Sequence, residues 1–279
     1  MITLSEIPSF LLAKDLIQER SIVEGDLSIS EASRRNHNIV VVREHGASYF
    51  LKEGVDQERS ATLINEGKFY EFLQSIPNLQ NKGYDRYLPK FYGYDTYHRI
   101  LILEYLPGGQ NLREYQLQHR YLPLYLARVL GDALGVIHSV TNVVQFQGNF
   151  WENSLVGPPW ILRSMYNPSV EIYQTMSSGN IHLIKILQQF PTLHLALDIL
   201  RDEWKNIALI HGDVKLDNCI VYSPSISGRK TRIKLVDWEL SQIGDPWYVT
   251  VHSSGARPGL PCRNVWVITT IPFAGGRYG

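Results

Sequence analysis

The sequence predicts an α+β protein in which an antiparallel sheet lobe precedes a mainly helical lobe. β-Branched and alternating segments dominate the first 106 residues, whereas leucines at helical spacing dominate the later part. A short stretch containing Pro and Gly, "PGGQN" at 107–111, separates the two regions. We therefore expect a β lobe at 1–106, a helical lobe at 107–249 and an atypical tail at 250–279.

Polar turn residues divide the first lobe into regular segments. Leucines and isoleucine at helical spacing predict a helix within residues 1–20, and a second apolar stripe predicts a helix at 58–75. The predicted strands are "DLSIS" (26–30), "NIVVV" (38–42), "ASYFLK" (47–52), "KFYGYD" (90–95) and "RILILEYL" (99–106).

Leucine stripes predict three helices in the second lobe, at 123–140, 181–190 and 192–207, and we expect these stripes to lie in the core. The last stripe consists of Leu193, Leu197, Leu200, Trp204 and Ile207. Two short apolar strands, "NCIVY" and "IKLVDW", are joined by a polar loop and predict a hairpin inserted among these helices.

Composition excludes several classes of protein. The formal net charge is zero, so no basic field suggests a nucleic-acid partner. Two cysteines, Cys219 and Cys262, are too few for a disulfide framework and favour a reducing compartment. Glu6 interrupts the only apolar N-terminal stretch, and no apolar run is long enough to span a membrane. We expect a cytoplasmic protein with no membrane partner.

The segment "IHGDVKLDNCIV" at 210–221 places polar residues at the ends of apolar strands. Asp213 follows one strand, Asn218 precedes the next, and Asp237 ends the one after that. Strand ends beside a hairpin bring such side chains close together. Carboxylate and amide oxygens suit Mg²⁺, which fills its remaining positions with water and phosphate oxygens. The pattern therefore favours a nucleotide phosphate site.

The motif H-G-D-x-x-x-x-N at 211–218, followed by a hairpin and "VDWE" at 236–239, resembles the aminoglycoside phosphotransferase and choline-kinase-like family. That family has a two-lobed protein-kinase-like fold. The resemblance implies that Asp213 is the catalytic base, that Asn218 and Asp237 hold Mg²⁺, and that His211 braces the loop. Lys215 would reach the γ-phosphate of ATP.

The same resemblance implies a nucleotide grip in the first lobe. Lys52, at the end of the third strand, corresponds to the lysine that holds the α- and β-phosphates of ATP. Glu66 in the following helix is its expected ion-pair partner, with Glu71 as the competitor.

The hinge of such a fold matches "LILEYLPGG" at 101–109. The backbone of Glu104, Tyr105 and Leu106 would meet the edge of the adenine ring.

Three features depart from the family pattern. No G-x-G-x-x-G loop precedes Lys52. Ser33, Arg34 and backbone amides are the alternative cover for the phosphates, although we expect Arg34 and Arg35 to be solvated turn residues. About 70 residues separate the helix near Ser139 from His211, which points to the small-molecule branch of the family. Residues after 246 lack any amphipathic period, and we expect a truncated or frameshifted C-terminus.

These features predict an ATP- and Mg²⁺-dependent kinase whose acceptor is a small-molecule hydroxyl, such as an aminoglycoside, choline or a metabolite alcohol. The helical insertion at 167–190 contains one acidic residue, Glu171, which disfavours a polycationic antibiotic. Lys215, usual in Ser/Thr kinases, keeps a peptide kinase of lanthipeptide-type maturation as an alternative. An inactive nucleotide-binding pseudokinase is the third.

Simpler roles compete for individual residues. Asp213, Asn218 or Asp237 alone could be a hydrogen-bonded turn residue. We expect His138 to be packed, Trp238 and Trp247 to be core aromatics, and Cys219 to be a small buried residue rather than a reactive thiol.

Overall fold

The computed structural model describes residues 1–32, 36–76, 83–142, 157–158, 162, 170, 174, 177–223 and 231–246. The chain divides into two compact units. The first contains Met1–Val140 with His211–Ser241, and the second contains Thr141–Ile210 with Gln242–Tyr248. The lobe boundaries expected at 106 and 249 stay a prediction.

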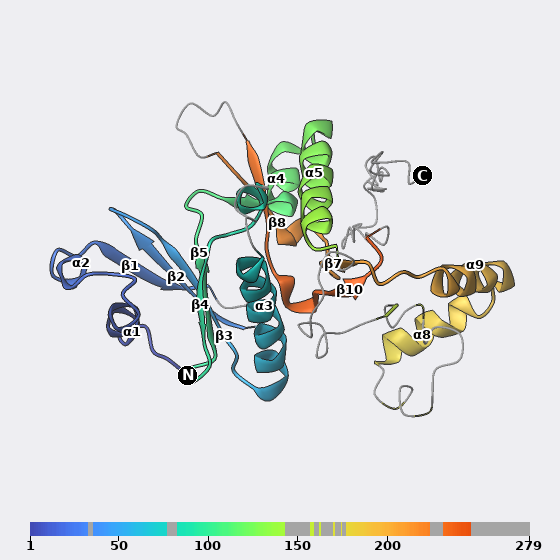
Figure 1. The fold of residues 1–279 in the computed structure, drawn as a ribbon, viewed down its shortest axis with the longest axis horizontal. Helices are drawn as coiled ribbons and strands as arrows, with labels where there is room; N and C mark the ends of the chain where they lie inside the picture. The colour runs from blue at the N-terminus through green and yellow to red at the C-terminus, as the bar shows by residue number, and fades with distance from the viewer. Residues whose placement is uncertain are drawn as a thin grey trace. The chain divides into compact units, whose positions relative to one another are not determined.

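A five-stranded antiparallel sheet lies in the first unit (Figure 1), and its strands have the order β1-β2-β3-β5-β4. The bounds are β1 (Leu27–Glu31), β2 (His37–Arg43), β3 (Tyr49–Glu53), β4 (Phe91–Asp95) and β5 (Ile100–Glu104). Each of the five strands predicted in this region is present.

The central strands carry apolar side chains on both faces, because both faces of the sheet are covered. Side chains alternate between the faces of a strand. Ile39 and Leu51 pack in one cluster with Leu11 of α1 (Ile7–Ala13). Phe50 and Lys52 therefore lie on the opposite face, and Lys52 there contacts Glu66 of α3 (Gln57–Ser75).

The single helix expected within residues 1–20 is wrong, because the segment forms α1 and a second helix, α2 (Glu19–Val23). Asp15 adopts a left-handed backbone conformation, with φ of 56°, and this ends the first helix. Ile7 and Leu11 of the expected stripe are buried, whereas Leu4 lies before the helix and is partly exposed.

Helix α3 (Gln57–Ser75) covers the second face of the sheet, and its bounds agree with the prediction. The side chain of Asp56 caps its N-terminus by accepting from the Arg59 N–H at 2.8 Å. Leu63 and Leu73 are buried on its inner face, and Glu66 is fully buried between them. A buried carboxylate requires a partner of opposite charge.

Helices and a small sheet complete the first unit. The helices α4 (Leu112–His119) and α5 (Leu124–Val140) follow the five-stranded sheet in this unit. It also contains 3₁₀ turns at Tyr84–Tyr87, Leu216–Asn218 and Trp238–Leu240. The small sheet contains β6 (Gln110–Asn111), β8 (Cys219–Tyr222) and β9 (Arg232–Leu235) in that order. The hairpin is confirmed, and the last two residues of the expected linker join its sheet. The predicted stripe of α5 is buried.

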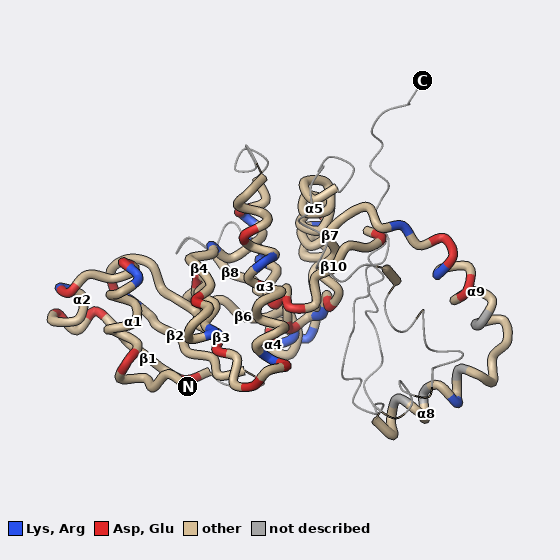
Figure 2. Tube along the Cα trace, turned by 60° about the horizontal axis from the view of Figure 1, so that its bottom comes forward, with Lys and Arg blue, Asp and Glu red and all other residues tan. Residues whose placement is uncertain are grey.

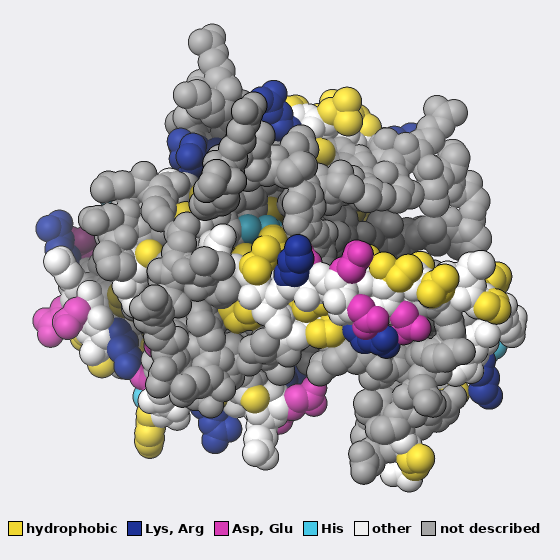
Figure 3. Space-filling model, turned by 45° about the vertical axis from the view of Figure 1, so that its right-hand side comes forward, with side chains coloured by type: hydrophobic (Ala, Val, Ile, Leu, Met, Phe, Trp, Pro, Cys, Tyr) yellow, Lys and Arg dark blue, Asp and Glu magenta, His cyan; other side chains and the backbone are white. Residues whose placement is uncertain are grey.

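The second unit contains α8 (Ser178–Leu187), α9 (Pro191–Asp202) and the antiparallel pair β7 (Ala208–Ile210) and β10 (Gln242–Gly244). The helix predicted at 192–207 is too long, because the Ile207 N–H already donates to the Gly244 carbonyl at 3.1 Å, next to the β7–β10 pair. Leu200, expected in the core, is 52% exposed, and hydrophobic side chains reach the surface in this region (Figure 3).

Acidic and basic residues are interspersed along the described chain (Figure 2), as the zero net charge suggests. No helix in this part of the chain is both apolar and long enough to cross a membrane. The predictions for Ser33, Arg34, Arg35, Glu171, Trp247 and the tail 250–279 lie outside the described residues.

A capping box begins α4 and provides a test of local stability. The Asn111 side chain accepts from the Glu114 N–H at 2.8 Å, and the Glu114 carboxylate accepts from the Asn111 N–H at 3.3 Å. We expect Asn111→Ala to lower the free energy of unfolding by about 1–2 kcal/mol. Leu117→Ala, at an exposed position of the same helix, should change it by less than about 0.5 kcal/mol. Urea unfolding measures both, and equal effects would contradict the capping role.

Candidate active site

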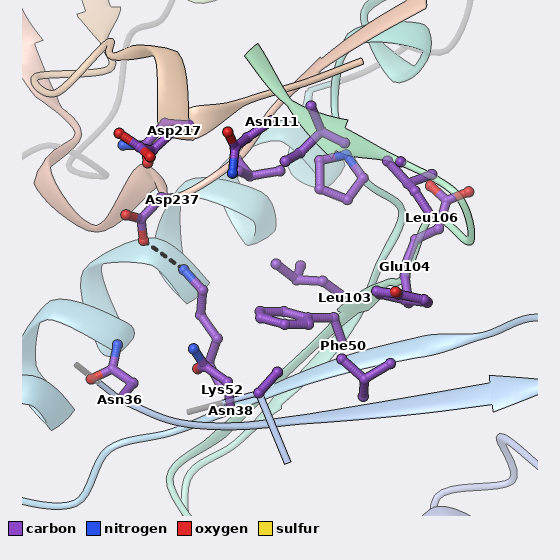
Figure 4. Close-up of a pocket in the computed structure, with 18 of the residues that line it drawn as sticks. Asn36, Asn38, Phe50, Lys52, Leu103, Glu104, Leu106, Asn111, Asp217 and Asp237 are labelled. Carbon is purple, nitrogen blue, oxygen red and sulfur yellow. Dashed lines mark hydrogen bonds and ion pairs between the residues drawn. The ribbon is translucent and has the colours of Figure 1, made fainter. Parts of the chain in front are cut away.

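A cavity of about 570 Å³ lies in the first unit and holds most of the predicted site residues (Figure 4). Leu103, Glu104 and Leu106 line one end of it, and Figure 4 shows Lys52 and Asp237 facing each other at another side. The predicted hinge and the predicted phosphate grip therefore border one space. Its volume is typical of ligand sites.

Lys52 joins two carboxylates from distant parts of the sequence. Its Nζ donates to Glu66 Oε2 at 2.8 Å and to Asp237 Oδ1 at 2.6 Å (Figure 4). The expected Lys52–Glu66 ion pair is present, and the competitor Glu71 is exposed on the other side of α3. Because Lys52 and Glu66 are both buried, each depends on the other for its charged state.

Burial and charge oppose each other in this cluster. Burial lowers the pKa of Lys52, but the negative charges of Glu66 and Asp237 outweigh it and raise that pKa above its ordinary value. Burial raises the pKa of Glu66, whereas the pKa of Asp237 is lowered because Lys52 outweighs its desolvation. Lys52 is therefore a fixed positive charge at neutral pH.

Asp237 has a strained backbone, with φ of 70° and ψ of 57°. Residues other than glycine rarely adopt this left-handed conformation, and they do so mainly where surrounding contacts enforce it. The next residue supplies those contacts. Trp238 is fully buried, its backbone N–H donates to Glu66 Oε1 at 3.2 Å, and its ring stacks on Phe69 at 4.0 Å.

His211 connects the two halves of the site. Burial lowers the pKa of its imidazole, so the ring is neutral near pH 7. Its Nε2 donates to the Val236 carbonyl at 3.0 Å, and its Nδ1 accepts from the Asp213 N–H at 3.3 Å. These two bonds assign the proton to Nε2. The ring therefore connects the loop before Asp237 with the loop that carries Asp213.

Asp213, Lys215 and Asn218 form one hydrogen-bonded group. Lys215 Nζ donates to Asp213 Oδ2, and Asn218 Nδ2 donates to the same oxygen at 3.2 Å and to the Asp213 carbonyl at 3.0 Å. Lys215 and Asn218 also line the cavity. The structure therefore brings the three predicted residues of this loop together at its edge.

Two side-chain oxygen atoms that border the cavity, one of Asn218 and one of Asp237, are suited to a cation. The amide nitrogen of Asn218 is occupied by Asp213, which leaves its Oδ1 without a partner among the described residues. Asp237 binds Lys52 through Oδ1, and its Oδ2 has no partner in the same part of the chain. No three His, Cys, Asp or Glu side chains gather there as a metal cluster. One carboxylate and one amide match Mg²⁺ that is completed by phosphates.

The hinge offers one free backbone donor. The Glu104 N–H donates to the Lys90 carbonyl at 2.8 Å, and the Tyr105 N–H donates to the Ser48 carbonyl at 2.9 Å. The Leu106 N–H has no partner among the described residues and borders the cavity. Of the three residues expected to meet a planar base, Leu106 is therefore the one whose backbone N–H is available to donate.

Sequence reasoning missed several groups around the cavity. Arg113 donates to both carboxylate oxygens of Asp217 at 2.9 Å, which ties α4 to the loop before Asn218. Asn38 on β2 and Asn36 just before it line the cavity, near the turn in which the family pattern has a glycine loop. Long-range pairs such as Arg113 with Asp217 leave no local periodicity. Asn38 pairs with Lys52 across the sheet, so their side chains lie on the same face, and Asn36, two residues earlier, belongs to that face as well.

Neighbouring groups have the simpler roles expected of them. Cys219 is buried, and burial raises the pKa of its thiol to about 12. His138 is packed against the core, and Trp238 is a core aromatic.

A family model described as the phosphotransferase enzyme family, APH, matches residues 28–248. The chain belongs to this family. A comparison with curated proteins found no match.

Two solved structures of aminoglycoside phosphotransferases have the same fold as this chain. The gentamicin complex of APH(2")-IIa has a TM-score of 0.52 at 18% identity, covering 88% of this chain and 73% of that one. The GDP and kanamycin complex of APH(2")-IIia has a TM-score of 0.53 at 14% identity, covering 88% and 76%. Choline kinase LicA from Streptococcus pneumoniae scores 0.49 at 17% identity, covering 85% and 72%. The predicted α+β, protein-kinase-like fold is confirmed.

Gly212 lies where no side chain fits. Its φ is 78°, and a Cβ atom would lie 2.2 Å from the Leu240 carbonyl oxygen. We expect Gly212→Ala to lower the free energy of unfolding by at least about 2 kcal/mol. Gly131→Ala in α5, where a Cβ meets open space, should raise it by about 0.5–1 kcal/mol. Urea unfolding of the pair tests this, and a neutral Gly212→Ala would show that the loop can move away.

His138 should make the protein sensitive to acid. Burial, with a smaller effect of His211, lowers the pKa of His138 from 6.5 to about 4. Between pH 6.5 and 4, His138 binds a proton in the unfolded chain but not in the folded protein. The free energy of unfolding therefore falls as the pH drops from 6.5 toward 4. Between about pH 7.5 and pH 5 the loss should be about 2 kcal/mol. His138→Gln should reduce the pH dependence of the free energy of unfolding by about this amount in urea unfolding, leaving the part due to His211, whose pKa is also lowered. An unchanged pH dependence would assign it to other groups.

Proposed function

We propose that this protein is an ATP- and Mg²⁺-dependent phosphotransferase that moves the γ-phosphoryl group of ATP to a hydroxyl of a small molecule. One observation carries the proposal: the buried Lys52 binds both Glu66 and Asp237 beside a cavity that the hinge also lines. Membership of the phosphotransferase family supports it.

The two parts of the cavity suit the two parts of a nucleotide. The free Leu106 N–H offers a donor to the edge of a purine, and the fixed charge of Lys52 suits the α- and β-phosphates. APH(2")-IIa, which has the same fold, has been solved with ATP and streptomycin. Asn36 and Asn38 lie near Lys52 in the cavity wall, where their amides can cover the phosphates.

Asn218 and Asp237 are the residues that would hold Mg²⁺, through the two oxygen atoms that have no partner in the described chain. Bound there, Mg²⁺ would neutralise charge on the phosphates. Lys52 orients Asp237 for this role. Glu66 in turn fixes Lys52, so the helix α3 sets the position of the phosphate grip.

Asp213 is the group that we assign to the acceptor. Its carboxylate orients the hydroxyl and accepts the hydroxyl proton. The hydroxyl oxygen then forms its bond to the γ-phosphorus while the bond from that phosphorus to the bridging oxygen breaks, and ADP leaves. Lys215 lines the cavity and donates to Asp213, so its charge can serve both the base and the transferred group. His211 holds Asp213 in place through the backbone.

The acceptor is proposed to be small because the similar structures were solved with gentamicin and kanamycin. The two cysteines and the ATP requirement fit a reducing, cytoplasmic setting.

Calorimetric titration with ATP, with and without Mg²⁺, tests the nucleotide site. We expect Mg²⁺-dependent binding by the wild type, its loss in Asp237→Ala, and its retention in Asp213→Asn. With an acceptor found by screening, Asp213→Asn should lower kcat about 10²–10⁴-fold. Asp132→Asn, at an exposed position of α5, is the matched control and should change neither measurement.

The outcomes separate the alternatives. Transfer of labelled phosphate to a Ser/Thr peptide and to no small alcohol would overturn the choice of acceptor. Binding of ATP without transfer to any acceptor would favour a pseudokinase. Absence of ATP binding by a folded wild type would contradict the nucleotide site itself.

A further inference from the structure

A second cavity, of about 330 Å³, adjoins the hinge in the first unit. Tyr70 and Leu73 of α3 form one side of it, Tyr84 and Leu88 another, and Phe91 of β4 a third. The walls are mainly aromatic and aliphatic. The volume lies at the lower limit of known small-molecule sites, so it suits a single substituted ring.

Glu104 forms a polar part of this wall. Its Oε2 accepts from the Lys90 N–H at 3.0 Å and from Lys234 Nζ at 2.9 Å, whereas its Oε1 has no partner among the described residues. Lys234 is buried and also donates to the Leu88 carbonyl at 2.6 Å. The lysine is thus satisfied, and the acceptor that is left over belongs to Glu104.

Tyr70 adds an unused donor. Its side chain is 3% exposed, and its hydroxyl has no hydrogen-bond partner in the described structure. Burial, strengthened by nearby carboxylates, raises the pKa of the phenol well above its ordinary value, so the hydroxyl keeps its proton. Its ring stacks on Phe91 at 5.3 Å. Buried tyrosine hydroxyls usually have a partner, so this one is available as a hydrogen-bond donor in the cavity.

We propose that this cavity is a second small-molecule site, that it takes a planar aromatic ring bearing one N–H donor and one carbonyl acceptor, and that its ligand alters nucleotide affinity through Glu104. An aromatic amide has this chemistry: its N–H suits Glu104 and its carbonyl suits Tyr70. The aromatic walls supply stacking surface.

The coupling follows from shared walls. Glu104 and Pro89 line both this cavity and the larger one, and Figure 4 shows Glu104 at the hinge end of the larger one. A ligand N–H on Glu104 Oε1 would fix the same carboxylate whose Oε2 accepts from Lys90 and Lys234, and the Glu104 residue itself lines the nucleotide cavity. By linkage, the factor by which the ligand changes ATP affinity equals the factor by which ATP changes ligand affinity.

Benzamide is the probe, titrated into the full chain by calorimetry with and without saturating Mg²⁺ and ATP. Gln74 lines the cavity and is exposed, so a larger side chain there can occupy part of the cavity without replacing a buried residue. We expect Gln74→Trp to weaken benzamide binding at least about ten-fold and Gln74→Ala to change it less than two-fold. Tyr70→Phe should weaken it about five-fold through one lost hydrogen bond. Benzamide should shift the Kd of ATP about five-fold or more.

Binding that ATP abolishes and that Gln74→Trp leaves unchanged would place benzamide in the nucleotide cavity and overturn the proposal. No binding by the folded protein at millimolar benzamide would overturn it as well. Binding that Gln74→Trp blocks, with no change in ATP affinity, would overturn the coupling through Glu104. The coupling rests on the proposed nucleotide site, whereas the effect of Gln74→Trp does not, so the two proposals fail separately.

Discussion

The first unit depends on the ion pairs that the Lys52 ammonium group makes with Glu66 and Asp237. A charge buried alone costs several kcal/mol, and so does each buried carboxylate, so Lys52 and Glu66 can be buried only together. That requirement fixes the central strand β3 against α3. The third member, Asp237, is less buried and comes from a loop far along the chain. The cluster therefore links sheet, helix and loop through electrostatics, beside the apolar packing of Trp238 on Phe69.

The residues around this cluster each add a contact that fixes the position of the loop carrying Asp237. Trp238 anchors it to α3 by stacking and by a hydrogen bond to Glu66. His211 holds its preceding carbonyl, and the absence of a side chain at Gly212 lets the two loops approach. The left-handed backbone of Asp237 is tolerated because these contacts act together. Rigid placement of a strained residue is typical of a functional site.

Local patterns were sufficient to predict the strands of the first lobe and helices α3 and α5, whereas the Lys52–Glu66 pair was expected from the family resemblance. The segment 1–20 and helix α9 were predicted less well, because their ends depend on a left-handed Asp15 and on the pairing of β7 with β10. Neither feature changes hydrophobic periodicity. The pairs Arg113–Asp217 and Lys234–Glu104 join segments more than 100 residues apart, so only the folded chain brings them together.

Cys219 illustrates how location governs chemical reactivity. It follows directly after Asn218, so an inhibitor that reacts with thiols would seem well placed to act there. Only the thiolate attacks electrophiles or peroxides, and with a pKa of about 12 on the order of one thiol in 10⁵ is ionised at neutral pH. The side chain is also buried. Covalent inhibitors and oxidative stress will therefore not act on the proposed catalytic loop through its own cysteine.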